Sequence, residues 1–259
     1  ACMVPVKGHA HLIEAMTRLP GRIDGRAPVL VLVGDGPLAP ALRAQARQLG
    51  IEGRIRWAGW QTDPAPYLQL ADLVVFPSLD AETLGWPARE AVLNSPLLPT
   101  ELQQPYAAIT TEVLKRIEQA FEQTPFTKIR LHGDCHHGNI LWTDHGPHFV
   151  DLDDCRNGPA IQDLWMLLNG NRQEQTLQLS AMLEGYALFR DFDYRELVLI
   201  EALRSLRMVH YSGWLAKRWD DPAFPAAFTW VASPHYWSQH LQDLENQREA
   251  MDEPPLRLF

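Results

Sequence analysis

Two aspartates and one asparagine carry the strongest chemical signal in this sequence of 259 residues. Asp134 and Asn139 stand in the polar stretch "HGDCHHGN", and Asp151 follows an apolar run in "FVDLDD". Phosphoryl transfer needs a carboxylate that faces the acceptor hydroxyl and oxygen ligands for the magnesium ions that bridge the phosphates. One aspartate, one amide oxygen and a second aspartate supply such a set. The cluster therefore predicts phosphotransfer chemistry.

Zinc binding and nucleophilic catalysis are less well supported by the same stretch. Its histidines suggest zinc, but structural zinc sites use paired ligands of defined spacing and a second ligand cluster, which the sequence does not supply. Cys135 is expected to pack in the interior and not to act as a nucleophile. The histidines concerned are His132, His136, His137, His145 and His148.

The elements that must position this cluster are short strands and loops over residues 128–153, because Gly133 and Gly138 allow the backbone angles of a tight turn. The chain from about residue 92 onward is otherwise helical in pattern. A long amphipathic helix is predicted over residues 99–123. Further helices are expected near residues 161–169, 174–189, 194–218 and 234–250.

The first part of the chain has a different rhythm, in which helical and strand patterns alternate between residues 7 and 91. "PVLVLVG", "RIRWAG" and "LVVFPS" are solidly apolar strand candidates, and helical patterns separate them. Such alternation is typical of a parallel sheet that is covered on both faces. The predicted fold is therefore an α/β partial Rossmann-like parallel sheet joined near residue 91 to a mostly helical lobe.

Composition narrows the class of protein. A net charge of −9 argues against a general nucleic-acid binder. No apolar run approaches the ~20 residues of a membrane span. The three cysteines make no disulfide framework, which favours a reducing compartment, and we expect a cytoplasmic protein. The amino end "ACMVPVKGH" lacks an initiator methionine and a signal-peptide layout, and it reads like the interior of a longer chain.

A long motif block in the second part resembles a known family. "LHGDCHHGNILW", "HFVDLDDCRNGPAIQDLWMLLNG" and the sequence through "EPPLRLF" are similar to the bacterial stress response kinase A family over residues 92–259. These are protein serine/threonine kinases with an aminoglycoside-phosphotransferase-like fold. The resemblance implies a kinase-like C-terminal lobe that uses ATP and Mg²⁺ and phosphorylates a hydroxyl group of a protein or a small molecule.

The resemblance also implies a role for each motif residue. Asp134 would be the catalytic base, with Asn139 and Asp151 as the magnesium ligands. His132 would organise the loop, and Asp163 in "QDLW" would brace the loop backbone from the start of a helix.

Residues 1–91 resemble another family, the retaining two-Rossmann glycosyltransferases of the GT-B type, family-4-like, in their C-terminal nucleotide-sugar-binding domain. The motifs are "KGHAHLIEAM", "LVLVGDGP", "RIRWAGW" and "ADLVVFPSLDAETLGWPAREA". By this resemblance Lys7 would touch the donor diphosphate, Glu90 the ribose hydroxyls and Glu82 the region of the donor sugar. Gly34 and Gly36 would let the backbone approach the ligand, as glycine loops do at phosphate sites.

Both modules look incomplete. A kinase needs an amino-terminal lobe with a glycine-rich loop and a strand lysine, and residues 1–131 show neither, so we expect an impaired phosphotransferase. Two alternatives stay open. One is a nucleotide-sugar-dependent glycosyltransferase, and the other is an inert chimeric fusion of the two modules. The sequence leaves the acceptor and the oligomeric state open.

Overall fold

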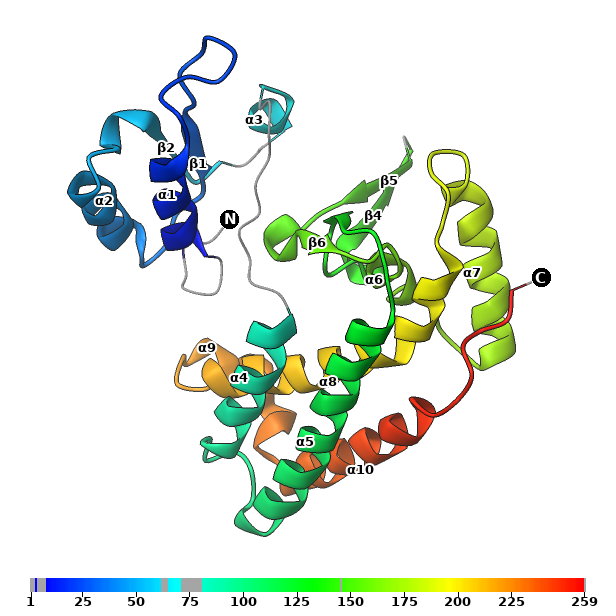
Figure 1. The fold of residues 1–259 in the computed structure, drawn as a ribbon. Helices are drawn as coiled ribbons and strands as arrows, with labels where there is room; N and C mark the ends of the chain where they lie inside the picture. The colour runs from blue at the N-terminus through cyan, green and yellow to red at the C-terminus, as the bar shows by residue number, and fades with distance from the viewer. Residues whose placement is uncertain (1–2, 4–7, 62–64, 71–80, 145, 259) are drawn as a thin grey trace. The chain divides into compact units, whose positions relative to one another are not determined.

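The computed structural model describes residues 3, 8–61, 65–70, 81–144 and 146–258 (Figure 1). The chain divides into two compact units. The first unit comprises Ala1–Leu79, His132–Asp134 and Leu141–Arg156, and the second comprises Asp80–Leu131, Cys135–Ile140 and Asn157–Phe259.

The amino-terminal part of the first unit contains the predicted parallel strands. β1 (Leu30–Val33) pairs in parallel with β2 (Ile55–Gly59). Helix α2 (Ala39–Gln48) makes the crossover between them, because parallel neighbours cannot be joined by a tight turn. The other elements are α1 (His9–Arg18), the 3₁₀ turn η2 (Glu52–Arg54) and α3 (Ala65–Leu70). The strand predicted at "LVVFPS" lies outside the described residues.

A small apolar core holds this part together. Ile13 of α1, Leu32 of β1 and Leu42 of α2 are buried against one another, and Ile55 of β2 completes the contact between the helices and the strands. Burial of apolar side chains between helices and strands is the main stabilising term for such a layer.

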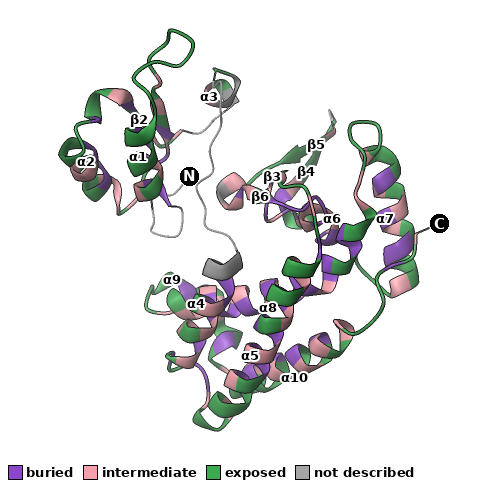
Figure 2. Ribbon diagram, viewed as in Figure 1, coloured by how far each residue is buried: buried purple, intermediate pink, exposed green. Residues whose placement is uncertain are grey.

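The segment around the polar cluster folds into short strands and turns, as predicted. β3 (Ile129–Leu131) pairs with β6 (Arg156–Gly158), and β4 (Ile140–Thr143) pairs with β5 (Gly146–Phe149). Figure 2 shows β4 and β5 as largely exposed, in contrast to the buried residues along the helices. Two 3₁₀ turns lie in this segment, η3 (His137–Asn139) and η4 (Leu152–Asp154).

The second unit is helical, as the periodicity of residues 92–259 predicts. The long helix α5 (Thr100–Gln123) and helix α10 (Pro234–Ala250) match the predicted bounds to within a residue. The remaining elements are α4 (Ala81–Leu93), α6 (Ile161–Trp165), α7 (Arg172–Tyr186), η5 (Tyr194–Leu199), α8 (Ile200–Lys217), α9 (Ala223–Ala227) and η6 (Thr229–Ala232). None of the described helices is long and apolar enough to cross a membrane.

Helices α4 and α8 cross at very short range. A Cβ atom on Gly213 of α8 would lie 2.4 Å from the Cβ of Ala88 on α4, and one on Gly85 would lie 2.5 Å from Cδ2 of Leu114. Glycine at position 213 therefore lets α4 and α8 approach closely, whereas the Gly85 contact is with a side chain of α5. Leu84, Ala88 and Val92 of α4 are buried in the same core as residues of α5 and α8.

Helix α4 is grouped with the helical unit. The change of module near residue 91 stays a prediction; of the described residues, those from Ala81 to Leu131 belong to the helical unit. The physical reason is the apolar face of α4, which is buried by the helices of the second unit.

Candidate active site

His132 ties together the two segments that carry the predicted aspartates. Its Nε2–H donates to the carbonyl oxygen of Val150 at 2.8 Å, and its Nδ1 accepts a hydrogen bond from the backbone N–H of Asp134 at 3.3 Å. Because a carbonyl oxygen can only accept, these two bonds require the neutral tautomer with the proton on Nε2. His132 thus connects the backbone of Asp134 with the residue that precedes Asp151.

Gly133 allows the turn that presents Asp134. Its φ is 85°, and a Cβ atom at this position would lie 2.1 Å from the carbonyl oxygen of Asp154 and 3.0 Å from Nε of Arg156. A side chain is excluded by this backbone contact, and the left-handed angle adds strain for any other residue. Asp134 itself is half-buried.

Asp151 adopts a left-handed conformation at the end of the β5 segment, with φ 59° and ψ 61°. This conformation is uncommon outside glycine, although aspartate and asparagine tolerate it best, and such residues cluster at functional sites. Asp151 is exposed and precedes the turn η4, but its side chain does not cap that turn. Asp151 is therefore accessible from solvent.

In the second unit, the turn η3 fixes Asn139. Nδ1 of His136 accepts a hydrogen bond from the backbone N–H of Gly138 at 3.0 Å, and the N–H of Asn139 donates to the His136 carbonyl at 2.9 Å. A Cβ atom on Gly138 would lie 2.9 Å from Cε1 of His136, so the imidazole cap needs glycine there. Asn139 is buried, with 8% exposure.

The same turn is attached to the end of helix α6. Nε2–H of His137 donates to the carbonyl oxygen of Leu167 at 3.1 Å. Asp163, the predicted brace of the loop, is half-buried in the first turn of α6. The turn that carries Asn139 is therefore bonded to the segment just beyond the helix that carries Asp163.

The predicted residues are thus distributed over both units. His132, Asp134 and Asp151 belong to the first unit, whereas Asn139 and Asp163 belong to the second. Asp151 and Asn139 offer a carboxylate and an amide oxygen, which are the donor types that magnesium prefers, so these residues fit the ion chemically. The described residues contain no group of three or more histidine, cysteine, aspartate or glutamate side chains that could hold a metal ion.

The residues of the glycosyltransferase alternative do not gather in one unit. Gly34 and Gly36 belong to the first unit and Glu90, which is exposed on α4, to the second. Lys7 lies outside the described residues, and the side chain of Glu82 is likewise not described.

The loop that contains Gly34 and Gly36 was expected to let a ligand approach its backbone. At Gly36 this close approach is made by the main chain of Met3. A Cβ atom on Gly36 would lie 2.6 Å from the backbone nitrogen of Met3. Met3 donates to the carbonyl of Asp35 at 2.9 Å and accepts from the N–H of Leu38 at 3.1 Å. The space that glycine leaves open at this position is therefore taken by the main chain of Met3.

A buried acid near α6 was not singled out from the sequence. Glu196 in η5 is 2% exposed, and its Oε2 accepts a hydrogen bond from the backbone N–H of Ile161 at 3.0 Å. Burial raises the pKa of Glu196, while the N–H donors of Ile161 and Ala160 oppose this shift. The only signal in the sequence is an acid inside the apolar run "ELVLIEAL", and this does not reveal the partner.

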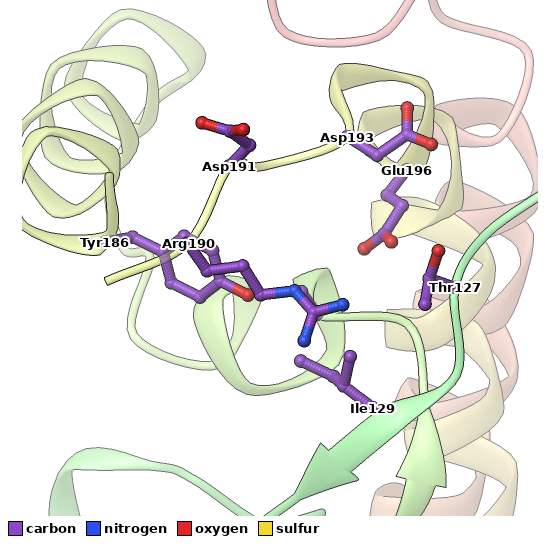
Figure 3. Close-up of a pocket in the computed structure, with 8 residues that line it drawn as sticks. Thr127, Ile129, Tyr186, Arg190, Asp191, Asp193 and Glu196 are labelled. Carbon is purple, nitrogen blue, oxygen red and sulfur yellow. The ribbon is translucent and has the colours of Figure 1, made fainter. Parts of the chain in front are cut away.

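Glu196 borders a small pocket of about 50 Å³ in the second unit (Figure 3). The carboxylate of Glu196 and the guanidinium of Arg190 point into this pocket, whereas the carboxylates of Asp191 and Asp193 point away from it. The residues that line it are Thr127, Ile129, Ala160, Tyr186, Arg190, Asp191, Asp193 and Glu196.

Comparison with known proteins agrees with the chemistry of the cluster. The sequence model described as "Phosphotransferase enzyme family" matches residues 5–199. Its span includes the polar cluster and also most of the segment whose motifs resemble a glycosyltransferase. None of the comparisons supports the glycosyltransferase resemblance.

Curated relatives match a long stretch of this chain. Stress response kinase A of Escherichia coli O157:H7 is 48% identical over 170 residues, which are 66% of this chain and 51% of that protein. Stress response kinase A of Salmonella typhi is 47% identical, and serine/threonine protein kinase RdoA of Salmonella typhimurium strain LT2 is 46% identical, both with the same coverage. The chain spans about half the length of the curated relatives that it matches.

Proposed function

Because the chain belongs to the phosphotransferase enzyme family, we propose that it is a serine/threonine kinase of the stress response kinase A type, which transfers the γ-phosphoryl group of ATP to a protein hydroxyl. The family supports the reaction class, and the names of the relatives support a protein acceptor. A small hydroxyl-bearing acceptor is the alternative within the same family.

Asp134 is the residue that orients the acceptor hydroxyl and takes up its proton. A carboxylate in this role must be held at hydrogen-bond distance from the proton that it accepts. The bond from the N–H of Asp134 to His132 and the glycine turn at Gly133 restrict the backbone of Asp134. Asp134 is only half-buried, so its carboxylate can meet a hydroxyl group from solvent.

Asn139 and Asp151 are the residues that hold magnesium. Bound magnesium supplies positive charge that offsets the charge on the phosphate oxygens during transfer. Asn139 contributes a neutral oxygen from a rigid turn, and Asp151 contributes a charged oxygen from an exposed position. Neutral amide oxygens and charged carboxylate oxygens are both donor types that magnesium accepts, so the two residues would suit this role.

The single observation that carries this proposal is the pair of hydrogen bonds made by His132. They connect the backbone of Asp134 to the carbonyl that precedes Asp151, in one compact unit. A histidine that served only for packing would not need both ring nitrogens engaged with these two segments. The glycosyltransferase alternative rests on the resemblance of its motifs alone, and no contact of the described residues favours it.

The test measures transfer of the radiolabelled γ-phosphoryl group from ATP–Mg²⁺ to peptides. Peptides that contain serine, threonine or no hydroxyl residue are assayed separately. We expect transfer that depends on the hydroxyl and that falls by about 10²- to 10⁴-fold in Asp134→Ala. Asp144→Ala, an exposed aspartate that follows β4, is the matched control and should keep full activity. Equal transfer by the wild-type chain and Asp134→Ala would defeat the assignment.

A further inference from the structure

Glu196 supplies from a distant element the cap that helix α6 lacks. The residue that precedes α6, Ala160, has no side chain that could accept a hydrogen bond, and the helix has no local side-chain cap. The carboxylate of Glu196 instead accepts from the backbone N–H of Ile161 at 3.0 Å. A carboxylate at this end satisfies donors that the helix leaves open and interacts favourably with its dipole.

Helix α6 depends on such contacts because it is short. It has 5 residues, Ile161–Trp165, and a helix of this length does not persist without tertiary support. Ile161 and Trp165 are buried in the same core as Leu197 and Leu199 of η5. The position of α6 is therefore set by η5, through both apolar contact and the Glu196 carboxylate.

The segment that follows α6 is bonded to the turn η3. The carbonyl of Leu167, just beyond α6, accepts a hydrogen bond from Nε2–H of His137, the first residue of the turn that ends at Asn139. The described contacts thus form a continuous path within the second unit. It runs from Glu196 through α6 to His137 and Asn139.

We propose that Glu196 is a positioning residue that holds α6 in place and, through the His137–Leu167 bond, fixes the turn carrying Asn139. This inference rests on the proposed function, because the position of Asn139 matters for catalysis only if it binds magnesium. In this role Glu196 acts through the backbone of α6 and not on the reacting groups.

The pocket beside Glu196 offers a matched control. Asp191 lines the same pocket, is exposed, and has a carboxylate that points away from it (Figure 3). Removal of its carboxylate changes the charge near the pocket by the same amount as removal of the Glu196 carboxylate. Only the Glu196 change removes the cap of α6.

The experiment is residue-resolved amide hydrogen exchange on the full chain for wild type, Glu196→Ala, Glu196→Gln and Asp191→Ala. Glu196→Ala should accelerate exchange at both Ile161 and Asn139 by about tenfold or more, since a buried donor loses its partner. Glu196→Gln keeps a carbonyl acceptor and should restore most of the protection at both amides. Asp191→Ala should match the wild type.

Acceleration at Ile161 with an unchanged Asn139 amide would overturn the proposal, because Glu196 would then be only a local cap. If Glu196→Ala unfolds the whole unit, the amide of Leu244 in α10 will also lose protection. In that case the variant His137→Ala tests the proposal, because it removes the hydrogen bond to Leu167. It should accelerate exchange at Asn139 while Ile161 keeps its protection. An Asn139 amide that is unaffected by His137→Ala would also overturn the proposal.

Titration of the same variants with ATP–Mg²⁺ separates this inference from the proposed function. We expect the apparent magnesium affinity to fall by about tenfold in Glu196→Ala and less in Glu196→Gln, as for residues that orient a metal ligand. A wild-type chain that does not bind ATP–Mg²⁺ would refute the proposed function, while the exchange data would still decide whether Glu196 positions Asn139.

Discussion

His132 and Val150 are joined by a hydrogen bond of 2.8 Å in which the imidazole Nε2–H donates to the carbonyl oxygen. The other ring nitrogen accepts from the backbone N–H of Asp134. Because one neutral ring satisfies both groups, the loop before Asp134 and the strand before Asp151 are held in a fixed relationship. This relationship links the acid proposed as base to the acid proposed as metal ligand.

Loss of the His132 imidazole should reduce phosphoryl transfer without unfolding the chain. In His132→Ala both hydrogen bonds disappear, and we expect the rate to fall by about 10- to 100-fold because the two acids lose their alignment. Peptide phosphorylation with ATP–Mg²⁺ measures this. His148→Ala, at an exposed histidine on β5, should keep the wild-type rate, and an equal loss in both variants would contradict the role of His132.

Replacement of Gly133 by alanine should destabilise the first unit more than the same change at Gly146. Both glycines have positive φ, 85° and 104°, but a Cβ atom meets the carbonyl of Asp154 at 2.1 Å only at Gly133 and meets nothing within 4 Å at Gly146. We expect Gly146→Ala to cost about 1 kcal/mol from backbone strain, and Gly133→Ala to cost about 2 kcal/mol or more beyond this. Urea unfolding of both variants measures the difference, and equal costs would show that the contact is easily relieved.

Alanine substitutions at two helical glycines, Gly213 at the crossing of α4 and α8 and Gly185 on α7, should have opposite effects on stability. Gly213→Ala should lower the free energy of unfolding by about 1–3 kcal/mol, because the new methyl group meets the Cα and carbonyl oxygen of Ala88. Gly185→Ala on α7 should raise it by about 0.5–1 kcal/mol, since the methyl group meets nothing within 4 Å and alanine favours the helix. Thermal and urea unfolding test both signs. Stabilisation by Gly213→Ala would contradict the close contact of these helices.

The buried imidazole of His240 should make stability depend on pH. Burial lowers the pKa of His240 to about 4 from its ordinary value of 6.5, against a smaller opposing effect of Asp243. The unfolded state therefore binds more protons between pH 6.5 and pH 4. The contribution is fully present above pH 6.5 and is lost as pH falls towards 4, by about 3 kcal/mol in total.

Urea unfolding at a series of pH values measures this effect. His240→Leu should remove this part of the pH dependence, because leucine does not titrate. His235→Ala, which changes an exposed histidine on the same helix, should leave it in place. A wild-type free energy of unfolding that stays constant from pH 6.5 to pH 4 would contradict the burial of a neutral His240.

Local sequence patterns were sufficient for the secondary structure of most of the described chain. The periodicity of residues 99–123 specifies α5, and solid apolar runs specify β1 and β2, because these patterns depend on which side chains face a core. The types and spacing of Asp134, Asn139 and Asp151 also suggested phosphotransfer, since few residue sets supply a base and two oxygen ligands. Membership of the phosphotransferase enzyme family agrees with this interpretation.

The sequence alone did not place α4. Its motif resembles one module, yet its buried face packs with α5 and α8 of the other unit. An apolar helix face can pack against any surface that fits it, and the short contact between Ala88 and Gly213 joins residues that are far apart in the chain. Local pattern therefore cannot identify the partner of such a helix.

The sequence by itself determined the helices α5 and α10, the parallel strand pair and the chemical character of the polar loop, because each depends on neighbours within a few residues. Only the tertiary structure decided that Glu196 caps the helix begun by Ile161 and that His137 bonds to Leu167. These bonds join residues about 30 or more positions apart, and they form because burial leaves polar groups that must find a partner wherever the fold brings one.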